Sequence, residues 1–483
     1  MKDISRNLTM LVDYYELTMG NGYFRKNMKE KIAYFDVFYR NNPDNGGYAI
    51  VAGLEQVIDY VNNLRFDEED IHYLRQRGCF KEDFLEYLRD FSFTGDIWAV
   101  PEGTVVFPGE PLMTVRAPAI EAQFIETYLL MMLNHQSLIA TKAARITRAA
   151  KGRAISEFGS RRAQGADAAI LGARAAYIGG VSGTACAIAD TAFGVPATGT
   201  MAHSWVQMFD SEYEAFKAYC EIYPNDVTLL VDTYNVLESG VPNAIKAFRE
   251  VLAPKGIKKC AVRIDSGDIA YLSGKIRKML DEAGFPECKI VASNSLDEYI
   301  IRGLIHQGAQ VDAFGVGERL ITAKSAPVFG GVYKLCAVED EQGNITPKIK
   351  LSENVGKITT PHFKKLYRLI GRDTGKAEAD LLCVHDEVID DTKPLEIFDP
   401  ENTWKTKILE NFKAVELLVP IFKNGRQVYE LPTIQEIRAH CKDSLESMWD
   451  EIKRFDNPHN YYVDLSQKLW DIKYGMIKHQ RHK

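Results

Sequence analysis

The sequence predicts an α/β protein whose main part is a β/α barrel. From about residue 153, apolar runs rich in β-branched residues alternate with helical stretches. Successive runs lie roughly 20 to 45 residues apart, which is the spacing that parallel β/α units require. A polar or glycine-rich cluster follows each of the first six runs. Because the carboxyl ends of barrel strands converge on one face, these clusters are expected to meet there.

Seven apolar runs are the candidate strands, and six polar clusters are the candidate rim. The runs are residues 153–157, 195–200, 227–231, 260–264, 289–292, 311–314 and 332–337. The clusters are residues 158–162, 201–203, 232–235, 265–268, 293–294 and 315–319. A single cluster of this kind is often only a helix N-cap, since Asp, Ser and Asn are common there. Six in series favour an active-site rim over a merely well-capped sheet.

The regions on either side of these runs have a different pattern. Residues 31–39 alternate like a strand, and residues 95–117 contain short β runs broken by Pro-Glu-Gly and Pro-Gly-Glu-Pro. We therefore expect a smaller α/β N-terminal domain before the barrel, to which C-terminal segments return. The expected ranges are 1–135 for the N-terminal domain, joined by part of 340–483; 136–345 for the barrel; and 346–483 for C-terminal segments, largely helical after 430.

Composition and charge narrow the class of protein. The chain has 483 residues, of which 46% are hydrophobic, and a formal net charge of −7. That charge gives no general attraction to nucleic acid or to anionic membranes. The eight cysteines are scattered singly, which predicts neither a zinc site nor a disulfide framework. The first residues lack the apolar stretch of a signal peptide and no apolar run is long enough to span a bilayer, so we expect a cytoplasmic protein.

The predicted rim combines cations, carboxylates and flexible turns. Its members are Arg161, Arg162, Arg263, Arg319, Asp232, Asp265, Asp268, His203, Gly315 and Gly317. Arginines beside exposed backbone N–H groups suit phosphate, because both donate hydrogen bonds to fixed anionic oxygens. Carboxylates beside a phosphate site suit Mg²⁺ or the hydroxyls of a ribose. No P-loop or other nucleotide-binding glycine signature is present, so any ATP is held in another way.

Two rim residues have alternative interpretations. Phe158 can stack on an aromatic ligand, or it can pack under a loop as an ordinary core residue. His203 is the one histidine within a rim cluster, and a lone histidine in a barrel loop is commonly structural. A histidine oriented by a neighbouring carboxylate can instead act as a base or nucleophile. Asp232, one strand along, is the nearest candidate to orient it.

At these positions the sequence resembles the nicotinate phosphoribosyltransferase family, which belongs to the barrel-type phosphoribosyltransferases. The resemblance extends from about Leu8 to Glu387. It is carried by residues 9–19, 35–40, 105–112, 137–146, 157–162, 199–203, 232–235, 263–268, 293–294, 314–317 and 350–368. Many short motifs in one order are far more specific than any one of them.

The resemblance implies a fold, a reaction and an assembly. It implies an irregular β/α barrel with a small N-terminal α/β domain, and a homodimer whose active sites are completed across the interface. It implies that nicotinate and phosphoribosyl pyrophosphate, with Mg²⁺, give nicotinate mononucleotide and pyrophosphate in NAD biosynthesis by salvage. It also implies coupling to hydrolysis of ATP through transient phosphorylation of a histidine.

The resemblance also assigns roles to residues by motif. His203 matches the phosphorylated histidine and Asp232 its hydrogen-bonding partner. Phe158 matches the residue that stacks on the pyridine ring, and Tyr15 matches an aromatic donated from the partner subunit to the other face. The remaining matches are Arg263 near the ring carboxylate, Asp265 near the ribose, Arg161, Gly315 and Gly317 at phosphate groups, and Ser293 and Asn294 in the substrate site. No residue is assigned as a metal ligand.

One position bears on the choice of substrate. In the related nicotinamide enzymes we expect a Gly-Thr-Asp sequence whose Asp accepts the amide N–H, whereas this chain has Ala185 after Gly183 and Thr184. An Asp would repel a carboxylate there, so Ala185 favours the acid over the amide. Phosphoribosyl transfer to nicotinamide or quinolinate is the alternative reaction. A catalytically silent ligand-binding homologue is the alternative class, and it would be expected to have lost rim residues that this chain retains.

Overall fold

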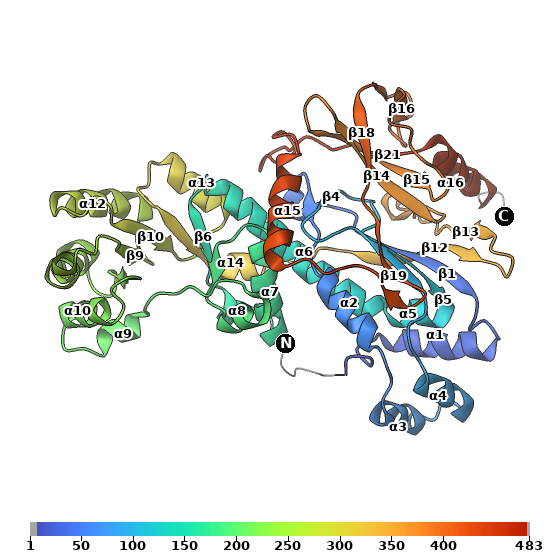
Figure 1. Ribbon diagram of the computed structural model, residues 1–483, viewed down its shortest axis with the longest axis horizontal. Helices are drawn as coiled ribbons and strands as arrows, with labels where there is room; N and C mark the ends of the chain where they lie inside the picture. The colour runs from blue at the N-terminus through green and yellow to red at the C-terminus, as the bar shows by residue number, and fades with distance from the viewer. Residues whose placement is uncertain (1–6, 481–483) are drawn as a thin grey trace. The chain divides into compact units, whose positions relative to one another are not determined.

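The computed structural model describes residues 7–480, which divide into two compact units (Figure 1). One unit contains Ile139–Pro327 and is called here the barrel unit. The other contains the residues up to Leu138 together with those from Val328 onward, and is called the split unit because two separate stretches of chain build it. Among the residues described, no helix is both long and apolar enough to cross a membrane.

Within the described part of the barrel unit, six strands form one parallel sheet in the order β7-β6-β11-β10-β9-β8. Their bounds are Gly183–Thr184 for β7, Ala154–Glu157 for β6, Ala313–Val316 for β11, Lys289–Ser293 for β10, Ala261–Ile264 for β9 and Thr228–Leu230 for β8. The strand order places β7 and β8 at opposite edges, so the barrel is irregular and open. The fold class expected from the sequence, α/β with an irregular β/α barrel, is thereby confirmed.

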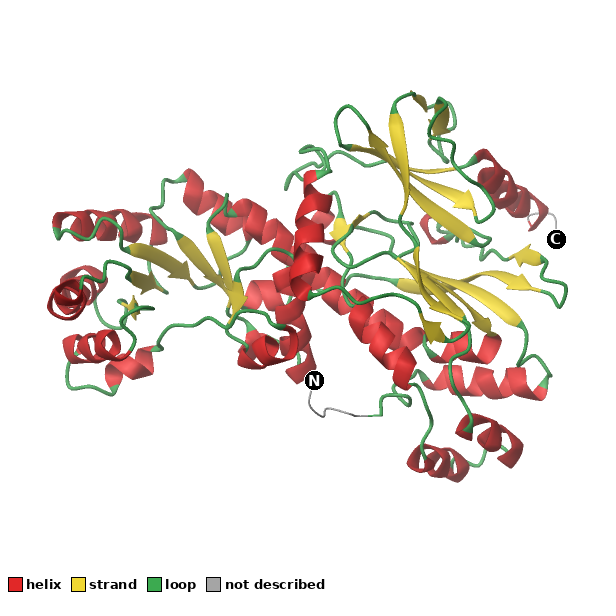
Figure 2. Ribbon diagram, in the orientation of Figure 1, coloured by secondary structure: helices red, strands yellow, loops and turns green. Residues whose placement is uncertain are grey.

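Helices surround this sheet, as Figure 2 shows. They are α7 (Ala166–Ile178), α8 (Ala187–Phe193), α9 (His203–Gln207), α10 (Glu212–Ile222), α11 (Val241–Ala247), α12 (Ile269–Glu282), α13 (Glu298–His306) and α14 (Glu318–Ile321). Asp268 caps α12 by accepting from the N–H of Tyr271, and Asp297 caps α13 in the same way. The alternative that some rim carboxylates serve as N-caps is therefore right for Asp268.

Two of the seven expected barrel strands are wrong. Residues 195–200 form a single bridge, between Thr184 and Ala197, and the short strand β7 occupies the sheet edge instead. Pro196 has no N–H to donate to a ladder, although its carbonyl accepts from the N–H of Thr184 at 3.0 Å. Residues 332–337 lie in β12 (Val332–Glu339), which pairs antiparallel with β1 (Ile32–Phe38) in the split unit. The apolar pattern of a segment indicates a strand but does not identify the strand with which it pairs, so the sequence could not reveal this pairing.

The sheets of the split unit are mainly antiparallel. Its largest sheet has the order β13-β12-β1-β5-β3-β19-β20 within residues 7–480, and a second has the order β18-β14-β15-β21. The bounds not yet given are β13 (Ile345–Pro347), β5 (Met113–Pro118), β3 (Asp96–Ala99), β19 (Val419–Lys423), β20 (Arg426–Gln427), β18 (Phe412–Glu416), β14 (Lys364–Gly371), β15 (Ala377–Val384) and β21 (Val463–Leu465). Pairing of Val419 with Ala99 joins β19 to β3, so the C-terminal chain returns to the N-terminal sheet.

Helices complete the split unit. α1 (Tyr14–Arg25) and α5 (Ala119–Phe124) pack together, and α5 also contacts β1 and β5. α6 (Glu126–Ala149) begins in this unit and continues into the barrel unit. Near the end of the chain, α15 (Ile434–Glu446) starts at a capping box between Thr433 and Glu436, and α16 (Gln467–Gln480) follows β21.

A buried ion pair lies in the core of the split unit. The guanidinium of Arg368 on β14 donates to both carboxylate oxygens of Asp380 on β15, at 2.9 and 2.6 Å, and the hydroxyl of Tyr461 donates to one of the same oxygens at 2.9 Å. The two charged side chains are 4% and 0% exposed. Removing one partner of such a pair leaves the other charge buried and uncompensated.

We therefore expect Asp380→Asn to lower the free energy of unfolding by about 3–5 kcal/mol, because Arg368 loses its counter-charge. Asp373→Asn is the matched control, since Asp373 is exposed in the turn between the same two strands and should change stability by about 0.5 kcal/mol or less. Urea denaturation followed by circular dichroism measures both. Equal midpoints for the two variants would contradict the assignment.

Candidate active site

The guanidinium of Arg263 is the centre of the polar rim. It projects from β9 and donates to the hydroxyl of Ser293 at 2.9 Å, the hydroxyl of Thr200 at 2.8 Å and the carboxylate of Asp265 at 3.0 Å. Its carbon lies 5.6 Å from the centre of the Phe158 ring. The side chain is 14% exposed. Residues from three expected rim clusters, and from the segment before His203, are thus brought together.

Two carboxylates line this part of the rim. Asp265 accepts from the hydroxyl of Ser293, which is 3% exposed. One carboxylate oxygen of Asp232, Oδ2, accepts from the N–H of Asp265 at 2.9 Å and from the hydroxyl of Ser266 at 2.6 Å. The other oxygen, Oδ1, is buried and has no hydrogen-bond partner in the described chain. A buried acceptor of this kind is suited to a hydroxyl donor or a hard cation.

His203 does not make the hydrogen bond that the sequence suggested. It is the first residue of α9, is half-buried, and shares a hydrogen bond of 3.1 Å between its Nδ1 and the hydroxyl of Thr233. Asp232 uses its hydrogen-bonded oxygen for Asp265 and Ser266 instead. The direct contact expected between Asp232 and His203 is therefore corrected: the residue next to Asp232 in the chain holds the imidazole.

Two glycines make room for Phe158. Gly315 on β11 is paired with Ser293 on β10, and a Cβ at Gly315 would lie 2.5 Å from the Phe158 ring. A Cβ at Gly317 would lie 3.1 Å from the carbonyl oxygen of Phe158. The N–H of Phe158 donates to the carbonyl of Val316 at 2.8 Å, which fixes its backbone between the two glycines. A side chain at Gly315 would overlap the ring, whereas one at Gly317 would require its neighbours to shift slightly.

A buried carboxyl group supports the segment that carries Phe158. Glu157, at the end of β6, is 0% exposed and burial raises its pKa. One of its oxygens accepts from the N–H of Gly159, and the other accepts from the hydroxyl of Thr184 on β7 at 2.6 Å. The carbonyl of Glu157 accepts from the N–H of Ala185 at 2.8 Å. Glu157 therefore ties the Phe158 segment to the position expected to determine substrate choice.

Other predicted residues lie at the rim without joining this network. Arg161 is exposed in the short helix Ser160–Arg162, and Asn294 is exposed just beyond β10 with a left-handed φ of 85°. Asn adopts that conformation more readily than most residues. Arg319 pairs with Asp297, so its charge is already engaged within the protein.

Tyr15 lies in the split unit, on α1, where its side chain is 44% exposed. Partial burial and the neighbouring Glu126 raise the pKa of its phenol, so the hydroxyl remains protonated at neutral pH. Its expected role in the active site of a partner subunit stays a prediction.

The sequence analysis assigned no individual role to several residues that take part in the hydrogen bonds of the rim. They are Glu157, Thr184, Thr200, Thr233 and Ser266. Each is an ordinary residue whose importance comes from a hydrogen bond to a more distinctive neighbour. Thr200, Thr233 and Ser266 lie within one to three residues of a predicted site residue. Their closeness in the chain to His203, Asp232 and Asp265 was the available signal.

Taken together, the fold and site define a class: a β/α barrel protein whose rim offers an aromatic face, a guanidinium and carboxylate acceptors. Comparison with known families then specifies it. Residues 10–134 match the nicotinate phosphoribosyltransferase N-terminal domain, residues 153–369 match the nicotinate phosphoribosyltransferase family, and residues 363–473 match the nicotinate phosphoribosyltransferase C-terminal domain.

Individual proteins agree with this result. A nicotinate phosphoribosyltransferase of Bacillus subtilis is 46% identical over 98% of this chain and 95% of its own length. The crystal structure of human nicotinic acid phosphoribosyltransferase superimposes with a TM-score of 0.84 at 28% identity, covering 97% of this chain and 100% of that one. That of nicotinate-nucleotide pyrophosphorylase from Pyrococcus furiosus gives 0.70 at 26% identity, covering 92% and 99%. The chain belongs to the nicotinate phosphoribosyltransferase family.

The packing around Phe158 gives a testable consequence. We expect Gly315→Ala to destabilise the protein by about 1–3 kcal/mol, because the new methyl group overlaps the Phe158 ring. Gly303→Ala is the control, since a Cβ at Gly303 on α13 meets no atom within 4 Å and should be neutral or stabilising by about 0.5–1 kcal/mol. Thermal denaturation distinguishes them. A Gly315 variant as stable as the control would show that the ring yields without cost.

Proposed function

We propose that this protein transfers the phosphoribosyl group of phosphoribosyl pyrophosphate to nicotinate, giving nicotinate mononucleotide and pyrophosphate. Membership of the family supports the proposal, as do the names of the relatives in Bacillus subtilis and in human. The observation that carries it is the position of the Arg263 guanidinium 5.6 Å from the Phe158 ring, because nicotinate is a planar aromatic ring bearing a carboxylate.

Arg263 has the capacity to bind that carboxylate. A guanidinium has five N–H donors, and three of them are used on Ser293, Thr200 and Asp265. The two that remain can donate to the substrate carboxylate, and the three internal hydrogen bonds hold the group in place beforehand. Phe158 supplies the surface on which the pyridine ring stacks.

Ala185 supports the choice of nicotinate over nicotinamide. It is exposed directly after β7, and its N–H is bonded to the carbonyl of Glu157. The methyl side chain can neither accept a hydrogen bond from an amide nor repel an acid. The backbone hydrogen bond fixes its position, so its side chain would decide between the two substrates.

The remaining rim residues suit the transfer of a ribosyl group. The ring nitrogen of nicotinate carries the attacking lone pair, so no strong general base is required. As the bond from C1 to pyrophosphate breaks, positive charge develops on the ribosyl centre and negative charge on the leaving group. Arg161 and the backbone at Gly315 and Gly317 would stabilise the phosphate groups, while Asp265 would accept from ribose hydroxyls.

Mg²⁺ fits this site as a substrate-bound ion. The described residues contain no group of three or more His, Cys, Asp or Glu side chains placed to hold a metal. The buried, unpartnered Oδ1 of Asp232 is nevertheless an acceptor that a hard cation would satisfy. Mg²⁺ commonly takes one or two carboxylates and completes its coordination with substrate phosphates and water. When bound it would neutralise charge on the departing pyrophosphate.

We also propose that hydrolysis of ATP is coupled to the reaction through phosphorylation of His203. The γ-phosphoryl group would pass from ATP to an imidazole nitrogen, releasing ADP, and water would later remove it as phosphate. Thr233 engages Nδ1, which leaves Nε2 as the acceptor nitrogen. The modification would add a charge of about −1.5 to −2, by analogy with other phosphoryl groups, close to the phosphate and magnesium subsites.

Assembly and cellular role complete the proposal. A homodimer would allow Tyr15 of one subunit to cover the nicotinate ring in the other, and the hydroxyl of this exposed tyrosine remains protonated at neutral pH. The product, a pyridine mononucleotide, would supply salvage synthesis of NAD in the cytoplasm. Sedimentation of the whole protein as a monomer at micromolar concentration would exclude the shared site.

The phosphohistidine proposal predicts the effect of one substitution. We expect His203→Ala to abolish ADP formation and ATP stimulation while slow, ATP-independent formation of nicotinate mononucleotide continues. His306→Ala, an exposed histidine on α13, should behave like the unchanged protein. Product and ADP are measured with and without ATP. ADP formation by the His203 variant would eliminate this residue as the coupling group, and failure of the unchanged protein to bind or turn over nicotinate would overturn the reaction itself.

Substrate choice gives a second prediction. We expect Ala185→Asp to lower kcat/KM for nicotinate by about tenfold or more relative to nicotinamide, because a carboxylate would face the substrate carboxylate. Ala185→Asn has nearly the same shape without the charge, and should change the ratio much less. Competition between the two substrates measures the ratio directly. Identical ratios for both variants would remove Ala185 from the specificity site.

A further inference from the structure

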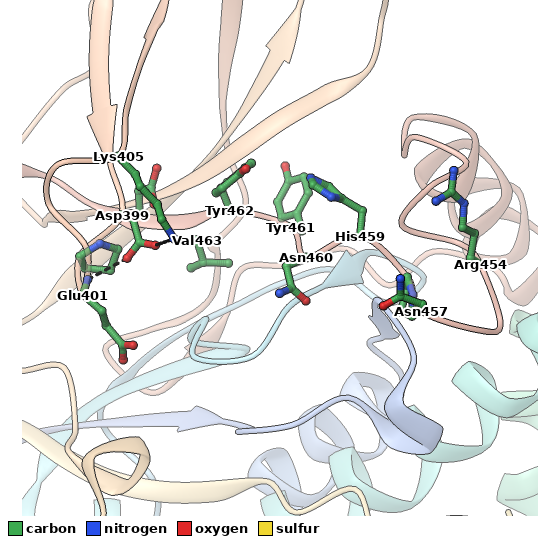
Figure 3. A pocket seen from close by; sticks show the side chains of 13 residues that line it. Asp399, Glu401, Lys405, Arg454, Asn457, His459, Asn460, Tyr461, Tyr462 and Val463 are labelled. Atoms are coloured by element: carbon green, nitrogen blue, oxygen red, sulfur yellow. Dashed lines mark hydrogen bonds and ion pairs between the residues drawn. The ribbon is translucent and has the colours of Figure 1, made fainter.

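A polar cavity of about 620 Å³ lies in the split unit, whereas the rim site belongs to the barrel unit. One wall comes from residues 399–405 and the other from residues 454–464 (Figure 3). Its volume is within the range of about 300–1,000 Å³ that is usual for small-molecule sites. The substrates proposed above give this cavity no role.

Asp464 on β21 is the unusual residue of the cavity. It lines the cavity and is 3% exposed, and its carboxyl oxygens are not among the enclosed, unpartnered side-chain atoms of the described residues, so they are open to the cavity. Burial, with a contribution from Asp399, raises its pKa to about 7. A buried carboxylate without a partner is costly, and in proteins such groups are normally paired. A cationic partner can reach Asp464 from the cavity.

The nearby cations pair with other carboxylates. The ammonium of Lys405 lies 3.8 Å from a carboxylate oxygen of Asp399, and the guanidinium of Arg454 lies 3.3 Å from Glu451. Asp399 also accepts from the N–H groups of residues 401 and 402, which hold its loop in place. The wall therefore carries three carboxyl groups, on Asp399, Glu401 and Asp464, against the cations Lys405 and Arg454, and the ammonium of Lys473 interacts with Glu401 from outside the wall.

Aromatic side chains face the same space. Tyr461, Tyr462 and His459 all line the cavity. Figure 3 shows their side chains between Asp399 and Lys405 on one side and Arg454 on the other. The hydroxyl of Tyr461 donates to Asp380 and its ring stacks on Phe107 at 3.8 Å, so its position is fixed from behind. Tyr462 is 44% exposed. Aromatic faces attract organic cations, and they do so most effectively beside a carboxylate.

We propose that this cavity binds a small organic cation bearing one or more ammonium groups, of the class of diamines and polyamines, with one ammonium paired to Asp464. A metal ion is disfavoured because no metal-binding group of three or more acidic, His or Cys side chains occurs in residues 7–480. The size of the cavity and its tyrosine rings suit a cation with an alkyl chain. A polyamine could pair with Asp464 at one end and Glu401 at the other.

Isothermal titration calorimetry of the whole protein with spermidine tests the proposal. We expect saturable binding of one spermidine molecule per chain. The affinity should be about tenfold lower in Asp464→Asn and unchanged in Asp471→Asn. Asp471 is exposed on α16 and does not line the cavity, so it is the matched control. Tyr462→Ala, which alters an exposed ring, should also weaken binding and guards against misfolding of the first variant. Removing the buried carboxylate should not lower the melting temperature.

The pH dependence of spermidine binding distinguishes ion pairing with Asp464 from binding that does not involve its charge. Binding should weaken as pH falls through about 7, because protonation of Asp464 removes the negative charge that pairs with ammonium. The other titratable or charged wall groups are Asp399, Glu401, Lys405, Arg454, His459, Tyr461 and Tyr462. Asp464→Asn retains all of these groups, so the difference between the two titrations reports Asp464.

Three results would overturn the proposal. The first is absence of saturable spermidine binding at a pH of about 8.5, where a carboxyl with a pKa of about 7 is ionised. The second is equal affinity for 1,4-butanediamine and for the neutral 1,4-butanediol, because a neutral ligand gains nothing from a carboxylate counter-charge. The third is displacement of spermidine by Mg²⁺ at equal concentration in the unchanged protein but not in Asp464→Asn, which would assign the cavity to a metal ion.

Discussion

The active-site rim depends on one arrangement, the fixing of the Arg263 guanidinium by three hydrogen bonds from different segments. Ser293 comes from the neighbouring strand β10, and Asp265 comes from the turn after β9, the strand that carries Arg263 itself. Thr200 comes from the segment before His203. A flexible arginine would lose conformational freedom on binding an anion, whereas this one has lost it already during folding. The donors that remain are thus oriented before any ligand arrives.

The aromatic side of the site is supported differently, by close packing and a buried acid. Gly315 permits the Phe158 ring to lie against β11, and Glu157 bonds both to the segment that carries the ring and to Thr184 on β7. Gly315 and Glu157 both help to position this ring: Gly315 leaves space for it, and Glu157 holds the backbone beside it. The position of the Phe158 ring therefore depends on neighbours that differ in kind, a glycine without a side chain and a buried carboxyl group.

The sequence predicted five of the six described barrel strands because parallel β/α units leave a strong pattern. It failed where the pattern says nothing about partners. Residues 332–337 had the composition of a barrel strand, yet they pair with β1 in the split unit. The contact expected between Asp232 and His203 failed for a related reason: Thr233, one residue along, has a hydroxyl that reaches the imidazole. The sequence alone does not show which of two adjacent side chains on one turn contacts a given residue.

By itself, the sequence determined the class of fold, the family and the residue types at the rim, because these follow from periodicity, from strand-end clusters and from the order of motifs. Only the tertiary structure decided which donor meets which acceptor, which strands leave the barrel, and that the buried Asp464 faces a cavity. The physical reason is that hydrogen bonds and burial depend on distances of a few ångströms between segments far apart in the chain. Local pattern carries no information about those distances.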